Sequence, residues 1–202
     1  MKKRWNMKKN KAYSLVEMII VIAIIAVMCG AAMVTVTLIN SAKTKEAGVT
    51  LDSEISGLLA KCKSQIVEFD DGTGKKVHKD FNYAIAIYKN NDNRFYIANG
   101  FYKYDKATDT KYFYVYDAEN ANGGKGTGIS SRVSIGYVPG SKNSGVVDNV
   151  AIAGASYTAW VISFDKAGRC ISGVGTYELN KASDNSTIDT ISVKANGSHV
   201  FK

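Results

Sequence analysis

Cysteine and histidine are scarce in this chain of 202 residues, which contains three cysteines and two histidines. The cysteines, at positions 29, 62 and 170, are too few and too widely spaced for a disulfide scaffold or a zinc site. His78 and His199 lie near a polar turn and near the chain end, and no serine or cysteine stands in a recognisable nucleophile motif. The sequence therefore predicts a protein that is not an enzyme and binds no cofactor.

Two of the cysteines leave an open question about redox state. Cys29 falls inside a long apolar run, so Cys62 and Cys170 are the pair that an oxidising exterior could join. The alternative, which we favour, is that both are small buried hydrophobic residues.

Acidic residues are absent from residues 1–12, which hold six lysines and arginines and carry most of the formal charge of +8. Residues 13–202 keep a net charge of only +2. A basic protein often binds nucleic acid or anionic lipid, but here the excess charge belongs to a short leader.

Charge is absent again from Met18 to Ile39, a run of 22 mostly apolar residues. As a helix this run would extend roughly 33 Å, which is enough to cross a bilayer once. It is longer than the apolar core of a secretory signal peptide. The basic leader places the N-terminus in the cytoplasm, so we expect the remaining chain to face outward.

The residues at this boundary, Ala12-Tyr13-Ser14-Leu15-Val16-Glu17 followed by Met18-Ile19-Ile20, resemble the class III signal of type IV prepilins and pseudopilins. In that family a prepilin peptidase in the membrane cuts the chain on the cytoplasmic side and methylates the new N-terminus. The resemblance implies cleavage between Ala12 and Tyr13, methylation of Tyr13, and Glu17 as the fifth residue of the mature chain.

Placing the carboxylate of Glu17 at the edge of a bilayer costs free energy, because it removes an anion from water. The positive end of a helix favours such a carboxylate by about 0.3 to 1 kcal/mol, which is too little to offset its removal from water. Methylation keeps an amine positive, so we expect the Tyr13 terminus of a neighbouring subunit to pair with Glu17 and set the axial register.

Two residues depart from the usual family pattern. Ala12 replaces a glycine before the cut, and Val34 stands where major pilins commonly carry a proline. The one proline of this chain is Pro139, which favours a pseudopilin or minor pilin. We also expect the stretch from Gly30 through Val34 to Thr37 to be a weak part of the helix that could loosen on assembly.

The predicted function is a structural subunit of a type IV pilus or pseudopilus, of the secretion or competence kind. The implied partners are other pilins, prepilin peptidase, a polytopic platform protein and a cytoplasmic assembly ATPase. The alternative is a single-pass anchor for a surface domain that binds a ligand without polymerising, with Glu17 lying among the lipid headgroups.

A helical pattern continues beyond the apolar run. Apolar residues at the spacing of one helix face predict a single helix from about residue 14 to 69, softened at Gly30 and Gly48 and ended by Asp70-Asp71-Gly72-Thr73-Gly74. We expect an α+β, pilin-like fold in which this helix packs on an antiparallel sheet. The predicted segments are a leader (1–12), a membrane helix (13–39), an amphipathic continuation (40–69) and a β-rich head (70–202).

Alternating aromatic and β-branched residues predict the strands of the head. The predicted ranges are 83–88, 94–98, 111–116, 132–138, 159–164, 170–177 and 190–194. The first three should form an antiparallel meander with a turn at 90–93, and 165–168 should be a hairpin turn. The glycine-rich stretch 123–128 lacks the spacing of a phosphate loop and is predicted to be a flexible surface loop.

Two groups of residues have side chains that could bind a ligand, calcium in one case and single-stranded DNA in the other. Asp184 and Asp189 could supply calcium ligands, but the residues around them match no EF-hand pattern, and solvated turn residues are the favoured interpretation. The aromatic residues between positions 95 and 116, with nearby lysines and arginine, could bind single-stranded DNA. Because side chains alternate along a strand, we expect about half of these rings in the core. Since residues 13–202 carry a net charge of only +2, an ordinary sheet surface is the favoured interpretation of the other rings, and DNA binding is the alternative.

Overall fold

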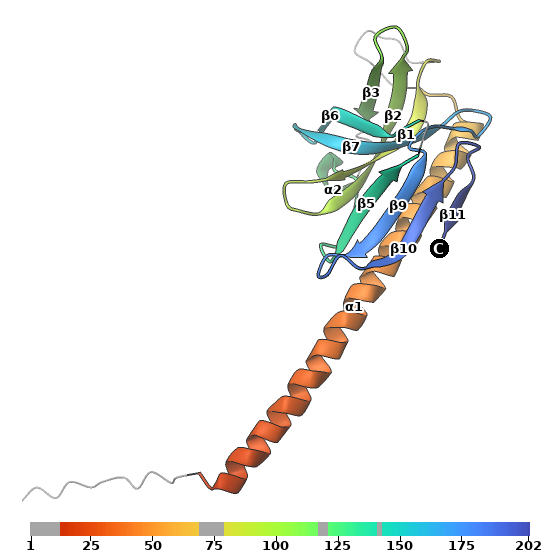
Figure 1. The fold of residues 1–202 in the computed structure, drawn as a ribbon. Helices are drawn as coiled ribbons and strands as arrows, with labels where there is room; N and C mark the ends of the chain where they lie inside the picture. Colours follow the sequence, from red (N-terminus) through yellow and green to blue (C-terminus); the bar gives the residue numbers. More distant parts are fainter. Residues whose placement is uncertain (1–12, 69–78, 117–120, 141–142) are drawn as a thin grey trace, which may run out of the picture. The chain divides into compact units, whose positions relative to one another are not determined.

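The structure is a computed structural model that describes residues 13–68, 79–116, 121–140 and 143–202 (Figure 1). The chain divides into two compact units, Met1–Ile39 and Asn40–Lys202. The fold is α+β, with a long N-terminal helix and an antiparallel β domain, as predicted.

The long helix α1 spans Leu15–Ser64. Neither Gly30 nor Gly48 interrupts it, so the predicted softening is absent from this structure. The helix ends at Ser64 rather than at residue 69, after a last turn that carries Lys61 and Lys63, whose charges suit the negative helix terminus. The predicted stop signal at 70–74 lies outside the described residues.

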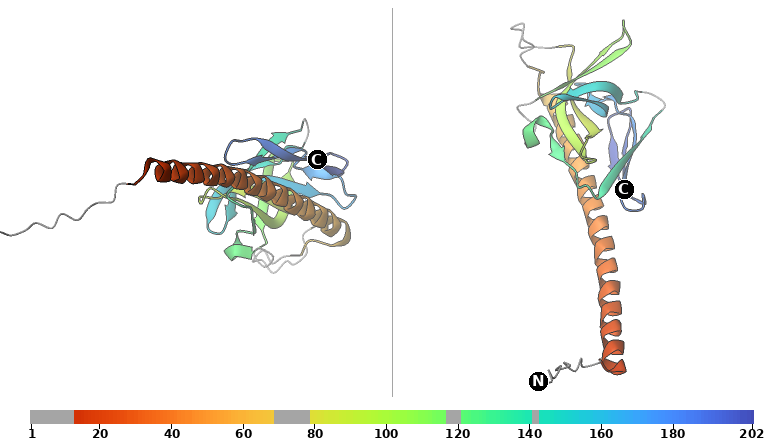
Figure 2. Two further views of the ribbon diagram at one scale, coloured as in Figure 1. Left: turned by 90° about the horizontal axis from the view of Figure 1, so that it is seen from below. Right: turned by 90° about the vertical axis from the view of Figure 1, so that its left-hand side faces the viewer.

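The buried face of α1 begins at Asn40. Its buried residues follow the predicted helical spacing and are Asn40, Thr44, Ala47, Gly48, Leu51, Ile55, Leu58 and Cys62. In both views of Figure 2 this part of the helix lies beside the strands of the second unit. An added Cβ at Gly48 would lie 2.7 Å from the ring of Phe201, so a larger residue here would force that ring to move.

The larger sheet has the order β3-β2-β1-β7-β6, and all its pairs are antiparallel. Short β4 pairs with β2 and short β8 pairs with β7. The strands are β1 (Asn82–Lys89), β2 (Phe95–Asp105), β3 (Thr110–Val115), β4 (Thr127–Gly128), β6 (Val146–Ile152), β7 (Ala155–Phe164) and β8 (Cys170–Ser172). The predicted meander is β1-β2-β3.

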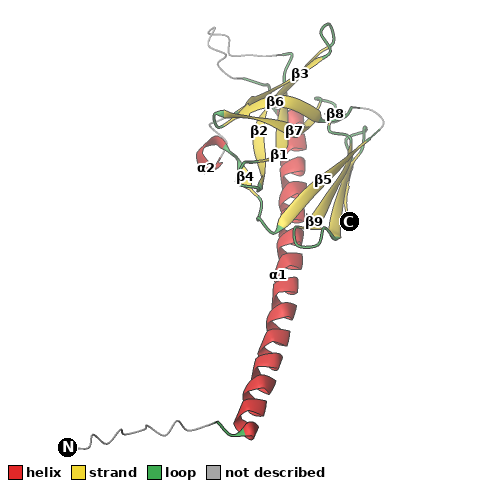
Figure 3. Ribbon diagram, turned by 60° about the vertical axis from the view of Figure 1, so that its left-hand side comes forward, coloured by secondary structure: helices red, strands yellow, loops and turns green. Residues whose placement is uncertain are grey.

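The smaller sheet has the order β11-β10-β9-β5 and is also antiparallel. Its strands are β5 (Val133–Pro139), β9 (Gly175–Lys181), β10 (Thr187–Val193) and β11 (His199–Phe201). Figure 3 shows that β5 and β9 run in a different direction from β6 and β7 of the larger sheet.

Two hydrophobic clusters hold the second unit together. The first joins the buried face of α1 to both sheets and includes Leu51, Ile55, Ile87, Leu179 and Ile191. The second belongs to the larger sheet and is built from side chains of β1, β2, β3, β6 and β7. Helix packing against the sheet, predicted from the apolar stripe, is confirmed.

The predicted strand at 170–177 is wrong. It is two strands, β8 and β9, which belong to different sheets. Gly173 lies between them at a φ of 87°, a conformation that favours glycine and turns the chain from one sheet to the other.

The glycine-rich stretch, predicted as a flexible loop, is instead structured. It contains the end of the short segment α2 (Ala121–Gly124), in which Asn122 and Gly123 have a positive φ, and the paired strand β4. The Tyr88 hydroxyl donates to the carbonyl oxygen of Lys125 at 2.9 Å, and the Asn122 side-chain amide donates to that of Gly126 at 2.8 Å. These bonds fix the segment against the sheet.

Candidate functional site

The beginning of α1 forms a capping box. Ser14 precedes the helix, and its backbone N–H donates to Oε2 of Glu17 at 2.8 Å. In return the Glu17 N–H donates to the Ser14 hydroxyl oxygen at 3.4 Å. A serine followed three residues later by glutamate satisfies two N–H groups that the first helical turn would otherwise leave unpaired. The Ser-x-x-Glu pattern in the sequence is the signal for this role of Ser14, which was not predicted.

The predicted cleavage point lies beside this cap. Tyr13 is non-helical and its exposed fraction is 81%. Ala12 lies outside the described residues. On the mature side of the predicted cut, Tyr13 is therefore accessible, and the helix cap begins at Ser14.

Every residue from Tyr13 to Ile39 is exposed, including the long series of isoleucines, valines and methionines. Among the described residues, α1 is the helix that is long and apolar enough to cross a membrane. An apolar surface of this size is unfavourable in water and requires lipid or other apolar helices around it.

Within this run the polar groups are satisfied locally. The hydroxyls of Thr35 and Thr37 donate to the carbonyl oxygens of Ala31 and Met33, at 3.0 Å and 3.1 Å. Gly30 has no atom within 4 Å of the position a Cβ would take. The two threonines therefore present no unpaired hydroxyl hydrogen to lipid.

Residues 7–33 match the family described as the prokaryotic N-terminal methylation motif. The chain carries a type IV prepilin-like class III signal. No match to this chain was found among curated proteins or among solved structures.

The prepilin-like signal and the apolar helix together fit a membrane-anchored protein with a structural rather than a catalytic role. The matched range contains Ala12, Tyr13 and Glu17, the residues predicted for cleavage, methylation and assembly. It does not extend into the β domain, so the match is informative about the anchor and not about the head.

The two head cysteines are separate thiols in this structure, and the bridge that the sequence left open is not formed. Both lie in the cluster between α1 and the sheets. The thiol of Cys62 donates to the carbonyl oxygen of Tyr83 at 3.4 Å, and that of Cys170 donates to the carbonyl oxygen of Ser172 at 3.0 Å. Burial raises the pKa of Cys62 to about 11 and that of Cys170 to about 12, so both thiols stay protonated.

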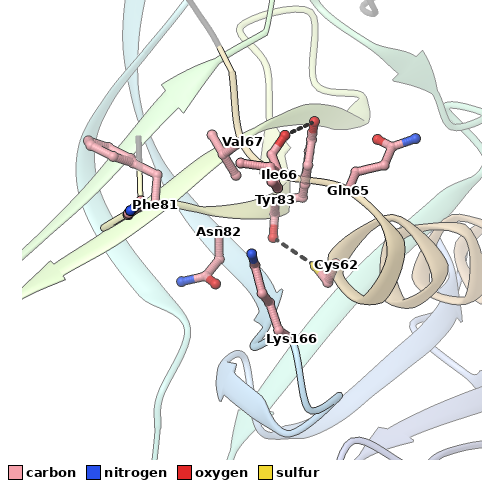
Figure 4. A pocket seen from close by; sticks show the side chains of 9 residues that line it. Cys62, Gln65, Ile66, Val67, Phe81, Asn82, Tyr83 and Lys166 are labelled. Carbon is pink, nitrogen blue, oxygen red and sulfur yellow. Dashed lines mark hydrogen bonds between the residues drawn. The ribbon is translucent and has the colours of Figure 1, made fainter. Parts of the chain in front are cut away.

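Cys62 also lines a cavity of about 330 Å³ where α1 ends. Figure 4 shows its neighbours, among them Tyr83, whose hydroxyl donates to the carbonyl oxygen of Ile66, and Lys166 from the turn between β7 and β8. A protonated thiol with this raised pKa is a poor nucleophile. Cys62 is therefore not an activated thiol in this cavity.

The two aspartates weighed as calcium ligands have different surroundings. The Ser186 hydroxyl and backbone N–H donate to Oδ1 of Asp184 at 2.6 Å and 2.9 Å and lower its pKa. Asp189 lies on β10, with Oδ2 buried and without a hydrogen-bond partner. In the part of the chain that the structure describes, no group of three histidine, cysteine or acidic side chains is placed to hold a metal.

The aromatic residues divide between core and surface, as predicted. Phe95, Tyr96, Phe101, Tyr102 and Phe113 are buried, whereas Tyr104, Tyr112 and Tyr114 are exposed. Nearby cations are partly engaged: Lys103 lies 3.9 Å from a carboxylate oxygen of Asp80, and Lys111 donates to the carbonyl oxygen of Ser144 at 2.8 Å.

A polar cluster joins α1 to the C-terminal strand β11. Nε2 of His199 lies 3.1 Å from the Ser56 hydroxyl oxygen and 3.4 Å from Oδ1 of Asp52. In a catalytic triad the carboxylate and the serine approach opposite ring nitrogens. Here both approach the same nitrogen, so the cluster holds β11 against the helix and does not activate Ser56.

Proposed function

We propose that this chain is a subunit of a type IV pilus or pseudopilus. It is inserted with its basic leader in the cytoplasm, cut between Ala12 and Tyr13, and methylated at Tyr13. The processed helix then packs among the helices of other subunits. The observation that carries this proposal is the prepilin-like signal followed by a helix whose apolar residues are all exposed from Leu15 to Ile39.

Glu17 supplies the specificity of the packing. One carboxylate oxygen is held by the Ser14 N–H, which orients the group toward the start of its own helix. The methylated amine of Tyr13 on a neighbouring subunit brings a positive charge to this carboxylate. An ion pair is strong where water is excluded, so it selects one axial register among the many that apolar side chains alone would permit.

Prepilin peptidase, a platform protein, an assembly ATPase and other pilins are the partners that this function requires. Val34 replaces the proline common in major pilins, which supports a pseudopilin or a minor subunit.

Replacement of Glu17 by alanine in the host tests the function. Membrane insertion should be retained and the chain should disappear from sheared filaments. If the wild-type chain never occurs in filaments, or if Glu17→Ala leaves its localisation unchanged, a non-polymerising anchor is favoured instead.

A further inference from the structure

The apolar run ends at Ile39, and the head covers the helix from the very next residue. Asn40 is 8% exposed and Thr44 is fully buried. The polar layer on each side of a bilayer is about 5 to 7 Å thick. At roughly 1.5 Å of rise per residue, the turn from residue 40 to 44 occupies that layer. Head residues that contact this turn therefore lie among lipid headgroups while the chain is in the membrane.

Arg132 makes this contact. Its Nη1 donates to Oδ1 of Asn40 at 2.8 Å, across 92 positions of sequence. Arg132 is an exposed residue that directly precedes β5. A guanidinium has five N–H donors in a planar fork that matches phosphate oxygens, and the bond to Asn40 uses one.

Other cations lie on the two elements that meet at Arg132, the helix α1 and the sheet of β5 and β9. Lys43 and Lys45 are on the same stretch of α1, and Lys181 pairs across the sheet with Val133, the neighbour of Arg132. Two acids offset them in part. Glu46 lies 2.6 Å from the ammonium of Lys43. Hydrogen bonds from Ser186 and the nearby charge of Lys181 lower the pKa of Asp184. We name Lys43, Lys45, Arg132 and Lys181 the basic rim; with these acids it keeps a net positive charge.

We propose that the basic rim binds the phosphates of anionic phospholipids and seats the head on the outer leaflet, with Arg132 as its central contact. The phosphate would share the guanidinium with Asn40, so the same arginine joins lipid, helix and sheet. This inference rests on membrane anchorage and on the head facing outward, and it does not require polymerisation.

Binding of the basic rim to lipid would affect a subunit that is still in the membrane. Basic side chains near an anionic surface each add to its attraction, and the effect falls off within a Debye length. The head should therefore be held close to the membrane when phosphatidylglycerol is present and should be released as the helix leaves the bilayer.

The test uses the full chain in nanodiscs of phosphatidylcholine that contain one-fifth phosphatidylglycerol. Part of the phosphatidylglycerol carries a photoactivatable headgroup. Crosslinked peptides are identified by mass spectrometry. We expect labelling of the peptide that contains Arg132, and R132Q should lower it about fivefold, the order expected for one basic side chain at an anionic surface. K106Q, which removes a lysine from the turn between β2 and β3, is the matched control and should leave this labelling unchanged.

R132K keeps a cation without the planar fork and should retain part of the labelling. If R132Q does not fold, the labelling of the Arg132 peptide in wild type and in R132K is compared instead. The proposal is overturned if the peptide following Ile39 is labelled while the peptide with Arg132 is not. It is also overturned if the Arg132 label is equal in R132Q and wild type.

Discussion

The backbone N–H of Ser14 donates to Oε2 of Glu17 at 2.8 Å, so the carboxylate proposed for assembly also caps its own helix. Glutamine can fill the same capping position because its side-chain oxygen also accepts a hydrogen bond. The cap and the charge of Glu17 are therefore separable by substitution.

Glu17→Gln should keep the first helical turn but lose filament incorporation as completely as Glu17→Ala, because the proposed partner is a cation. The measurement is the amount of the chain in sheared filaments relative to the membrane fraction. Incorporation restored by glutamine would show that capping, and not charge pairing, is the requirement.

Two glycines should respond oppositely to alanine. Gly126 has a φ of 92°, and an added Cβ would clash with the carbonyl oxygen of Ile97. Gly126→Ala should destabilise the head by at least about 2 kcal/mol. Gly57 is an exposed helical residue with nothing near its Cβ position, so Gly57→Ala should stabilise by roughly 0.5 to 1 kcal/mol.

These changes can be measured by urea unfolding of the detergent-solubilised chain, with Trp160 fluorescence as the probe. Its ring packs 5.9 Å from that of Phe95 and therefore reports on the core. Equal losses at both glycines would contradict the account.

Leu51→Ala tests the docking of α1 on the sheets. Leu51 is fully buried in the first cluster, so its truncation should cost about 2 to 5 kcal/mol. Val49, two residues earlier, is 60% exposed, and its replacement by alanine should change stability by less than about 0.5 kcal/mol. Similar effects of the two substitutions in the same unfolding assay would mean that this helix face is not packed.

The buried thiols predict a loss of stability at high pH. Burial raises the pKa of Cys62 from 9.0 to about 11, so the thiol ionises more easily in the unfolded chain. Its contribution to stability is complete below pH 9.0 and declines as pH rises toward about 11. Cys62→Ala should show a shallower decline than wild type over this window; identical slopes would contradict the assignment.

The sequence predicted those elements whose pattern is local. The buried residues of α1 repeat at helical spacing, and β1, β2 and β3 are rich in aromatic and β-branched residues. Strand β6 was missed because Asp148-Asn149 resembles a turn. In the structure these residues form a bulge, with Asn149 at a φ of 57°, and pairing with β7 resumes at Val150.

For the functional residues, contiguous motifs were predictable from the sequence and long-range contacts were not. The signal around Ala12, Tyr13 and Glu17 is contiguous and could be read directly. The contact of Arg132 with Asn40 joins residues 92 positions apart and depends on how the sheets fold onto the helix. No local spacing in the sequence encodes it.

Mass spectrometry of the mature N-terminus, from a host with active prepilin peptidase, decides whether this chain is processed as a prepilin. We predict a chain that begins at Tyr13 and carries one methyl group on its amine. An unmethylated chain that still begins at Met1 would contradict this prediction.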